Sequence, residues 1–542
     1  MKYRRSLLVS TVAVLAFVSG GWLLQRPAIQ DSDAIEKERL FKEVLGHVSR
    51  YYVDTVETAD LYEMAIEGML DRLNDPYTNF LRPQAYEELT LSTTGDYGGV
   101  GIRIESRDQW ITIVGPLADT PGDRAGLVSG DQIVEINGMP TKGWTTQQAA
   151  DVMRGEPGTS VDLTIVRAGV GKPMEFTITR AEIHVNYVEG QMMVAPEIGY
   201  LQLTSVSREA PYEVREAVNQ LRSQGARALI FDLRGNPGGI LEEGVALADL
   251  FLDRGEVVVE MKGRARGASR TYETERSEAW ADMPMVVLVG RGTASAAEII
   301  AGALQDHDRA LIVGSRTFGK GVAYVVVPLS ETEALSVTTS RWYTPNGRSI
   351  DRTYEAVRAR MIAQAGPAGQ TVASVGAAAA ISRPEPESDS VVYYSDAGRK
   401  LEGGGGIKPD IEIQDTLSEG EQRFAEVLGA DIPHYRDALA RYALDLKASG
   451  TVTEEGFEVS QAMLQGLLEQ LHQRGVEMPD SVWTGAQGLL SEQLGFEISR
   501  FVFGRPAELR RRVRADLGVQ RAIELLQQAR TPEDLYRLTG EN

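Results

Sequence analysis

The chain has 542 residues, a net charge of −21 at pH 7 and no cysteine. A chain of this length exceeds a single hydrophobic core and is expected to fold as several domains. The negative charge argues against nucleic-acid binding, because neutralising phosphates requires clustered Lys and Arg, and the lack of cysteine excludes disulfides, a thiol nucleophile and cysteine-based metal sites.

The N-terminus combines basic residues with an apolar stretch. Lys2, Arg4 and Arg5 precede the largely apolar residues 7–24, a pattern typical of a secretory signal or an uncleaved membrane anchor. No clear small-x-small cleavage site follows, which favours an anchor. The positive-inside rule then places everything after about residue 30 outside the cytoplasm. We therefore expect residues 1–30 to be a signal or anchor and the rest of the chain to be exported, in a periplasm-like compartment.

Residues 31–94 have helical periodicity, with apolar side chains three and four positions apart in two stripes. We expect helices that pack on the core or pair with another subunit. One stripe contains Leu40, Phe41, Val44, Leu45, Val48 and Tyr51, and the other Leu61, Ala65, Met69 and Leu73.

Residues 95–180 form a separate β-rich region. The Gly-rich loop YGGVGI (97–102) leads into a strand, and the segment GDQIVEING (130–138) follows it; together they resemble a PDZ domain. The resemblance implies a helix at 145–154 and strands at 159–166 and 174–179. It also implies that an extended peptide adds to a sheet edge while loop N–H groups capture its carboxylate. It thereby assigns peptide binding to Gly99, Val100, Gly101 and Ile102; the alternative is a hairpin loop without a ligand.

The next region, from residue 181, alternates strands and helices. An apolar run at 228–233 precedes RGNPGG (234–239), and a helical pattern covers 241–252. We read this as a buried strand with a sharp turn into a helix. The consecutive glycines Gly238 and Gly239 can aim backbone N–H groups into a cleft, as an oxyanion hole requires. An ordinary strand-to-helix turn is the alternative.

A serine occupies a comparable position in the following unit. An apolar strand at 285–289 runs into a turn, and Ser295 opens a helix at 296–304. The N–H groups and dipole at a helix start favour negative charge, so they can stabilise an oxyanion. The alternative is structural, because Ser295 and Glu298 also match a capping box.

Lys320 stands between two glycines, with apolar residues on both sides. A serine hydroxyl needs a base, and burial lowers the pKa of a lysine so that a neutral amine becomes available. The pair Ser295 and Lys320 thus fits a Ser–Lys variant of the triad. Considered alone, Lys320 would be interpreted as a solvated surface charge.

The five histidines are scattered and form no metal-binding pair such as HExxH, so we expect no metal. His307 follows Asp306 near the serine helix. By spacing alone, a Ser-His-Asp triad that uses His307 stays open.

Five motifs in order resemble the carboxyl-terminal processing proteases, or tail-specific serine peptidases. The resemblance covers roughly residues 35–415, and it implies an α/β protease core with an inserted PDZ-like domain. It argues against the Ser-His-Asp alternative. The motifs are DLRGNPGG (232–239), TASAAEIIAGALQD (293–306), VGSRTFGKG (313–321), YTPNGRSI (343–350) and GGGIKPDI (404–411).

The resemblance also implies roles for single residues. Ser295 would be the nucleophile and Lys320 the general base. The oxyanion donors would be the Ala296 N–H and a glycine N–H of Gly238–Gly239, with Glu298 as a supporting polar residue.

One position departs from the family pattern. Members commonly carry a glutamine four residues after the lysine, where it helps to position the amine, and this chain has Tyr324. A tyrosine hydroxyl can also hydrogen-bond an amine.

We therefore expect an α/β protease core with an inserted PDZ-like domain, N-terminal helices and a C-terminal helical region. The expected boundaries are 1–30, 31–94, 95–180, 181–415 and 416–542, with a mobile low-complexity insertion at 355–390. The role of 416–542 stays open between packing, oligomerisation and partner docking.

The expected activity is that of an exported, membrane-anchored serine endopeptidase acting on proteins or peptides with a free C-terminus, without a cofactor. The sequence leaves a homo-oligomer or an activating partner open. The alternative is a catalytically impaired peptide-binding scaffold of the same fold.

Overall fold

The computed structural model describes residues 32–358, 392–413 and 417–538. The chain divides into two compact units, Met1–Asp75 and Pro76–Asn542, each of which is described here by itself. Most of the expected insertion at 355–390 lies outside the described residues.

The first unit contains two described helices, α2 (Ser32–Tyr51) and α3 (Thr58–Arg72), in line with the two apolar stripes of the sequence. Many of their large apolar side chains are exposed, for example Phe41 and Met69. The expected anchor at 1–30 lies outside the described residues, and among the described helices none has the length and apolar character needed to cross a membrane.

The PDZ-like module is built on an antiparallel sheet with the strand order β3-β4-β5-β7-β8, to which β6 adds at β5. Strand β3 lies at the edge of this sheet. Strands β2 and β9 pair with each other, so the chain enters and leaves the module through one two-stranded ribbon. The elements are β2 (Asp96–Gly99), β3 (Ile102–Arg107), β4 (Trp110–Pro116), α5 (Pro121–Arg124), β5 (Gln132–Ile136), β6 (Met139–Pro140), α6 (Thr146–Met153), β7 (Ser160–Val166), β8 (Met174–Thr179) and β9 (Ala181–His184).

Helix α6 begins at a capping box. The Gln148 N–H donates to Thr145 Oγ1 at 3.1 Å, and the Gln148 side chain accepts from the Thr145 N–H at 2.9 Å. These bonds satisfy two of the N–H groups that a helix start leaves unpaired. The positions of α6, β7 and β8 agree with the helix and strands expected from the sequence.

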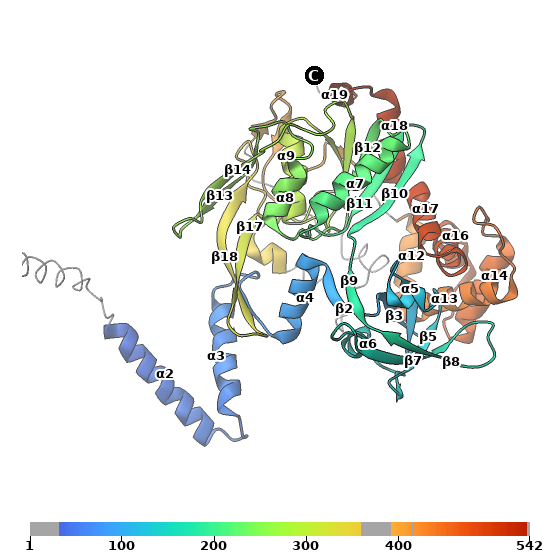
Figure 1. Cartoon of the computed structure of the whole chain (residues 1–542), viewed down its shortest axis with the longest axis horizontal. Helices are drawn as coiled ribbons and strands as arrows, with labels where there is room; N and C mark the ends of the chain where they lie inside the picture. The colour runs from blue at the N-terminus through green and yellow to red at the C-terminus, as the bar shows by residue number, and fades with distance from the viewer. Residues whose placement is uncertain (1–31, 359–391, 414–416, 539–542) are drawn as a thin grey trace, which may run out of the picture. The chain divides into compact units, whose positions relative to one another are not determined.

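The central sheet has the strand order β10-β11-β12-β15-β16-β21. Strand β10 runs antiparallel to β11, and the remaining neighbours are parallel. The strands and the helices between them, shown in Figure 1, are β10 (Val188–Ala195), β11 (Ile198–Leu203), α7 (Ala210–Ser223), β12 (Ala228–Asp232), α8 (Leu241–Ala248), β15 (Met285–Val289), α9 (Ala296–Asp306), β16 (Leu311–Gly314) and β21 (Ile411–Glu412).

Both faces of this sheet are covered, as a parallel sheet requires. Successive side chains of β12 point to opposite faces: Leu229 and Phe231 pack in the core beneath α7, α8 and α9, and Ile230 packs on the other side. The cover on that other side comes from the last helices of the chain, with Val519 and Leu525 against the sheet. Part of the C-terminal region therefore packs against the central sheet and covers its second face.

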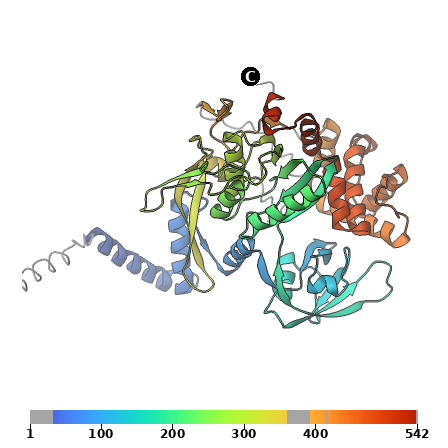
Figure 2. The same ribbon diagram turned by 45° about the horizontal axis from the view of Figure 1, so that its top comes forward.

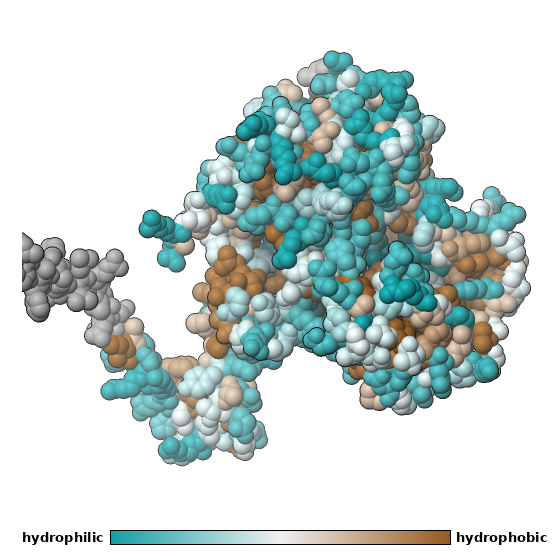
Figure 3. Space-filling model, viewed as in Figure 1, coloured by the Kyte–Doolittle hydropathy of each residue, from teal (hydrophilic) through white to brown (hydrophobic). Residues whose placement is uncertain are grey.

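A second, smaller sheet carries the lysine segment. Its order is β1-β18-β13-β14, with β17 paired to β18. On the face drawn in Figure 3, brown apolar surface gathers over the β17–β18 hairpin, where Val325 and Val327 are exposed. The elements are β1 (Asn79–Leu81), α4 (Pro83–Thr94), β13 (Val257–Gly263), β14 (Arg270–Glu273), β17 (Val322–Pro328), β18 (Ala334–Tyr343) and the separate hairpin β19 (Val392–Tyr394) with β20 (Lys400–Glu402).

The C-terminal region is helical, as expected. Most of its helices share a core of their own around Tyr435, Leu467 and Leu494. Figure 2 shows them in orange and red, gathered beside the central sheet. They are α12 (Glu419–Leu428), η1 (Gly429–Asp431), α13 (Ile432–Ser449), α14 (Gln461–Gln473), α15 (Asp480–Gly485), α16 (Gln487–Ile498), the π-helix η2 (Ser499–Phe503), α17 (Arg505–Ala515), α18 (Leu517–Gln528) and α19 (Pro532–Arg537).

These helices also contact the PDZ-like module. The Lys447 ammonium donates to the Ser129 carbonyl at 3.0 Å, and the Arg474 guanidinium pairs with the Asp108 carboxylate. The C-terminal region therefore packs against both the α/β core and the PDZ-like module.

Candidate active site

Ser295 lies in the turn between β15 and α9, with φ 54° and ψ −120°. A residue that only caps a helix has extended backbone angles, whereas a positive φ is uncommon for serine and carries strain. The helix start is closed by the Ser295 carbonyl, which accepts from the N–H groups of Glu298 at 2.8 Å and Ile299 at 3.0 Å. The capping interaction expected between Ser295 and Glu298 is present, since the Ser295 N–H donates to the Glu298 carboxylate. Capping does not explain the positive φ of Ser295.

The Glu298 carboxylate joins the serine turn to the lysine loop. Its Oε2 accepts from the backbone N–H groups of Ser295 and Lys320, each at 2.9 Å. Its Oε1 accepts from the Gly319 N–H at 2.7 Å and the Thr317 hydroxyl at 2.5 Å. The side chain is fully buried, and burial raises the pKa of Glu298 while the four hydrogen bonds oppose that rise. The sequence predicted a supporting residue here, and the structure shows which atoms it holds.

The Lys320 loop is fixed on both sides of the lysine. The Phe318 N–H donates to the Thr293 carbonyl at 2.9 Å, and Trp342 Nε1 donates to the Lys320 carbonyl at 3.0 Å. Phe318 and Val322 belong to a small buried cluster with Ala294. The lysine therefore has the apolar surroundings that its sequence neighbours predicted.

The Lys320 ammonium lies over two aromatic rings. Nζ is 4.5 Å from the centroid of the Tyr324 ring and 4.7 Å from that of Tyr77. The sequence suggested that the Tyr324 hydroxyl would hydrogen-bond the amine; the structure instead turns the face of the ring towards it.

The glycine turn lies against the nucleophile. A Cβ at Gly238 would lie 2.8 Å from both the Ala296 nitrogen and Ser295 Cβ, so only glycine fits there. The Gly238 N–H donates to Asn236 Oδ1 at 2.8 Å. Among the hydrogen bonds of the described residues, none uses the N–H of Gly239 or of Ala296 as donor. Of the two glycines, Gly239 is therefore the better candidate for an oxyanion donor.

The glycine-rich loop of the module, residues 99–102, connects β2 to the edge strand β3. Within the part of the chain that the structure describes, the N–H groups of Val100 and Gly101 are not used in any hydrogen bond found there. The loop is far in sequence from Ser295, and Gly99 and Ile102 belong to strands β2 and β3.

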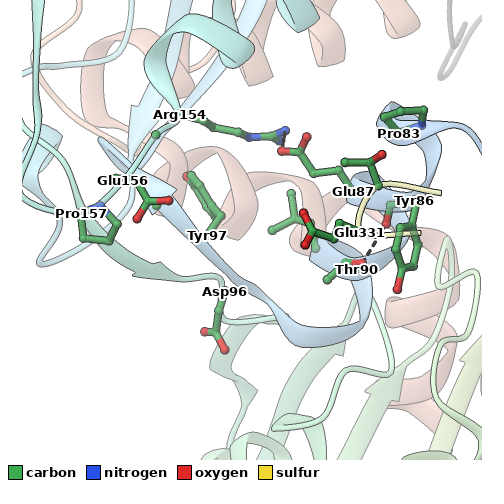
Figure 4. A pocket seen from close by; sticks show the side chains of 14 residues that line it. Pro83, Tyr86, Glu87, Thr90, Asp96, Tyr97, Arg154, Glu156, Pro157 and Glu331 are labelled. Carbon is green, nitrogen blue, oxygen red and sulfur yellow. Dashed lines mark hydrogen bonds and ion pairs between the residues drawn. The ribbon is translucent and has the colours of Figure 1, made fainter. Parts of the chain in front are cut away.

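A pocket of about 520 Å³ lies beside this loop, between α4, the start of β2, the end of α6 and the turn before β18. Figure 4 shows Arg154 reaching across it to Glu87, with Nη1 3.3 Å from Oε1. The Arg154 guanidinium also lies 5.6 Å from the centroid of the Tyr97 ring. Arg154, at the end of α6, thus contacts an element outside the module.

His307 lies at the opposite end of α9 from Ser295. An 11-residue helix is about 16 Å long, so a triad of Ser295 with His307 is excluded. His307 Nδ1 faces Asp396 at 2.7 Å and Glu256 at 3.3 Å, while Nε2 lies 2.7 Å from the Val257 carbonyl. Three such side chains can hold a metal ion, but an imidazolium between two carboxylates accounts for the same geometry.

The sequence matches three family models: Peptidase family S41 over residues 197–356, the PDZ domain over 112–167, and the activating protease CtpB N-terminal domain over 24–85. It is 37% identical over 314 residues to the carboxy-terminal-processing protease of Bartonella bacilliformis, covering 57% of this chain and 71% of that protein. It is 41% identical over 293 residues to the carboxyl-terminal-processing protease of Synechocystis sp., covering 53% and 68%.

This chain belongs to the carboxyl-terminal processing proteases. It is a serine-type peptidase with a PDZ domain, and the family, the fold class and the enzyme class expected from the motifs are confirmed. The roles assigned to single residues stay predictions.

Two features of this peptidase's site were missed by sequence reasoning. Tyr77 precedes β1 and lies outside the S41 match, and no spacing relates it to Lys320. Asn236 was quoted in the DLRGNPGG motif, but nothing in the sequence says that its side chain engages the Gly238 N–H. A short motif gives residue types, and it leaves side-chain contacts between distant segments undetermined.

Proposed function

We propose that this chain is an exported endopeptidase in which Ser295 is the nucleophile and Lys320 the general base. It cleaves exported or membrane-associated proteins and recognises their C-terminal tails through its PDZ domain. The observation that carries this proposal is that Ser295, at φ 54°, and Lys320 donate their backbone N–H groups to the same Glu298 oxygen. The bond from the Ser295 N–H is also the backward half of a capping box, but a helix cap does not require the second bond, from the Lys320 N–H to the same oxygen.

In the proposed reaction the neutral Lys320 amine takes the Ser295 hydroxyl proton as Oγ attacks the scissile carbonyl carbon. The negative charge on the carbonyl oxygen is stabilised by the N–H groups of Ala296 and Gly239. The C–N bond then breaks, and Lys320 returns the proton to the leaving amine. Water hydrolyses the acyl-enzyme by the same steps.

The PDZ domain would hold the tail of the substrate. An extended peptide can add to β3, which is an edge strand, and the loop N–H groups of Val100 and Gly101 can bind its carboxylate. Export and anchoring through residues 1–30 belong to the same proposal and rest on the basic-apolar pattern of that segment. A second copy or an activating partner is compatible with the exposed apolar side chains of α2 and α3.

The proposal is tested with an unfolded protein substrate followed by gel. Ser295→Ala should abolish cleavage while the protein stays folded, and Lys320→Arg should do the same, because arginine does not deprotonate in proteins. The wild-type rate should rise with pH as the lysine loses its proton. Wild-type activity in the Ser295→Ala variant would refute the assignment of Ser295 as the nucleophile.

One observation favours the alternative of an impaired scaffold. Two ring faces beside Nζ stabilise the charged ammonium, which is the form that cannot act as a base. A serine-directed fluorophosphonate separates the two functions: labelling of Ser295 that is lost in Lys320→Ala supports the peptidase, and absence of labelling at alkaline pH supports the scaffold.

A further inference from the structure

The two tyrosines beside Lys320 come from segments far apart in the chain. Tyr77 directly follows the first residue of the second compact unit, and Tyr324 lies in β17. An ammonium is attracted to the negative face of an aromatic ring when it lies within about 6 Å of the centroid. Both rings meet that condition, at 4.7 Å and 4.5 Å.

The Tyr77 ring is held in place by its surroundings. Its side chain is buried in the cluster that contains Phe318 and Val322. Its carbonyl accepts from the Ser336 hydroxyl at 2.9 Å, and its ring meets the Tyr354 ring edge-on with a centroid separation of 6.3 Å. A ring fixed in this way presents a constant surface to the lysine.

We propose that Tyr77 and Tyr324 are positioning residues that hold the Lys320 ammonium between their ring faces and set the pH at which this lysine becomes a base. The proposal rests on the proposed role of Lys320. It gives Tyr77 a role beside the lysine, and it assigns the ring of Tyr324, instead of its hydroxyl, to the contact.

The direction of the effect follows from the charge. A ring face attracts the ammonium and has little attraction for the neutral amine, so each ring favours the charged form. Burial raises the pKa of Tyr324, which favours the neutral phenol. Removing a ring should therefore lower the pKa of Lys320, and removing a hydroxyl should leave it unchanged.

Other charged groups near the lysine loop stay in place in these variants. The Glu298 carboxylate binds the Lys320 backbone N–H. Asp351 accepts from the Gly321 N–H at 3.3 Å and pairs with Arg341. Arg352 donates to the Phe318 carbonyl at 2.7 Å. Together with Tyr354, which packs against Tyr77, these groups are the same in all variants. A shift in the titration of Lys320 on replacing one ring is therefore caused by the loss of that ring.

The test measures the lysine directly. Full-length protein carrying Ser295→Ala is acetylated with trace acetic anhydride at a series of pH values, and mass spectrometry of the Lys320 peptide gives the labelling midpoint. Tyr324→Leu and Tyr77→Leu should each lower this midpoint by about half a unit to one unit. Tyr324→Phe and Tyr77→Phe should leave it within about 0.2 units of the parent, because the ring faces remain.

The matched control is Tyr272→Leu, which removes a ring 4.4 Å from the Arg270 guanidinium on β14 of the same sheet and should leave the midpoint unchanged. Tyr77 is buried, so circular dichroism checks its variants, and the half-exposed Tyr324 carries the test if Tyr77→Leu unfolds. A Leu variant with an unshifted midpoint, or a Phe variant that shifts as much as Leu, would overturn the proposal.

This outcome is separate from that of the proposed function. The midpoint is measured in the Ser295→Ala protein, which cannot cleave. If the midpoint shifts in the Leu variants but the wild type is never labelled by a fluorophosphonate, the role of the two rings stands and the peptidase mechanism is rejected. If a fluorophosphonate labels the wild type but the midpoint does not shift in the Leu variants, only the role of the two rings is rejected.

Discussion

Two glycine-rich segments of this peptidase present backbone N–H groups, and they are held in different ways. The turn that ends at Gly239 is bound by permanent charges: Arg234 pairs with Asp232 at 2.7 Å and with Asp516 of the α18 N-cap at 2.8 Å. The glycine-rich loop at residues 99–102, for which we propose tail binding, follows the β2–β9 ribbon. There, His184 contacts Asp96 at 2.8 Å and Glu213 of α7 at 2.9 Å.

The difference follows the work that we propose for each segment. Stabilising an oxyanion demands donors fixed in advance, because reorganisation at the moment of reaction raises the barrier. A loop that binds a tail in the ground state tolerates more motion, since a looser loop lowers affinity without touching the chemistry. The turn should therefore control the catalytic rate, and the loop should control binding.

The largest effect is expected for Gly239→Ala. Its φ is 151°, and a Cβ there would lie 2.1 Å from the Val206 carbonyl oxygen, so the turn must shift. A misplaced donor of this kind costs on the order of 10²-fold in kcat, with no change in tail-peptide affinity. Peptide hydrolysis and fluorescence anisotropy measure the two quantities.

The control for that variant is Gly235→Ala in the same turn. Gly235 also has a positive φ, of 74°, but a Cβ there meets nothing within 4 Å. It should keep most of the activity. Equal losses in both variants would show that turn strain, and not the displaced donor, is responsible.

Gly101→Ala should produce the converse result. Gly101 has φ 73°, and a Cβ would lie 2.3 Å from Thr120 Cβ, so the loop must open. A displacement that costs about 1.4 kcal/mol weakens tail binding about tenfold. Hydrolysis of a short substrate with an amidated C-terminus should be unchanged.

Gly126→Ala controls for backbone strain within the same module, because its φ is 79° and a Cβ meets nothing within 4 Å. If amidating the substrate C-terminus does not weaken binding to the wild type, the loop has no carboxylate role and this half of the comparison fails.

A smaller effect is expected for Asp516→Asn. Asparagine is as good an N-cap as aspartate, so the bond to the Val519 N–H, now 2.9 Å, can persist while the charge facing Arg234 is lost. A partly exposed pair contributes about 0.5–1 kcal/mol, or roughly two- to fivefold in kcat. Glu524→Gln, which breaks the exposed Arg521 pair on the same helix, should leave kcat unchanged.

These contacts mark the limit of what the sequence predicts. The strand, turn and helix around Gly238 and around Ser295 follow from apolar runs and glycines, and five ordered motifs identify the family. The cover of the central sheet by α18 did not follow, because an amphipathic pattern gives a buried face without its partner. Nor did the pairing of Asp516 with Arg234, or the approach of Tyr77 to Lys320, since both join segments that only the tertiary fold brings together.

The smallest effect concerns pH and separates the two segments most cleanly. Burial of the His184 ring opposes its charge, but the hydrogen bonds that the ring donates to Asp96 and Glu213 outweigh this, so the pKa of His184 is raised above its ordinary value of 6.5. A raised histidine pKa stabilises the fold fully below about pH 6.5, and this stabilisation is lost as pH rises through the folded-state value. His184→Gln should therefore lower the melting temperature most near pH 6, and the difference from wild type should shrink towards alkaline pH.

Tail affinity should follow the same trend, whereas the effect of Asp516→Asn on kcat should be the same across this range, since arginine stays charged. His434→Gln, at an exposed position, serves as the control. A melting difference that does not change with pH would mean that His184 acts by packing, and the proposed contrast between a permanently charged turn and a titratable loop would fall with it.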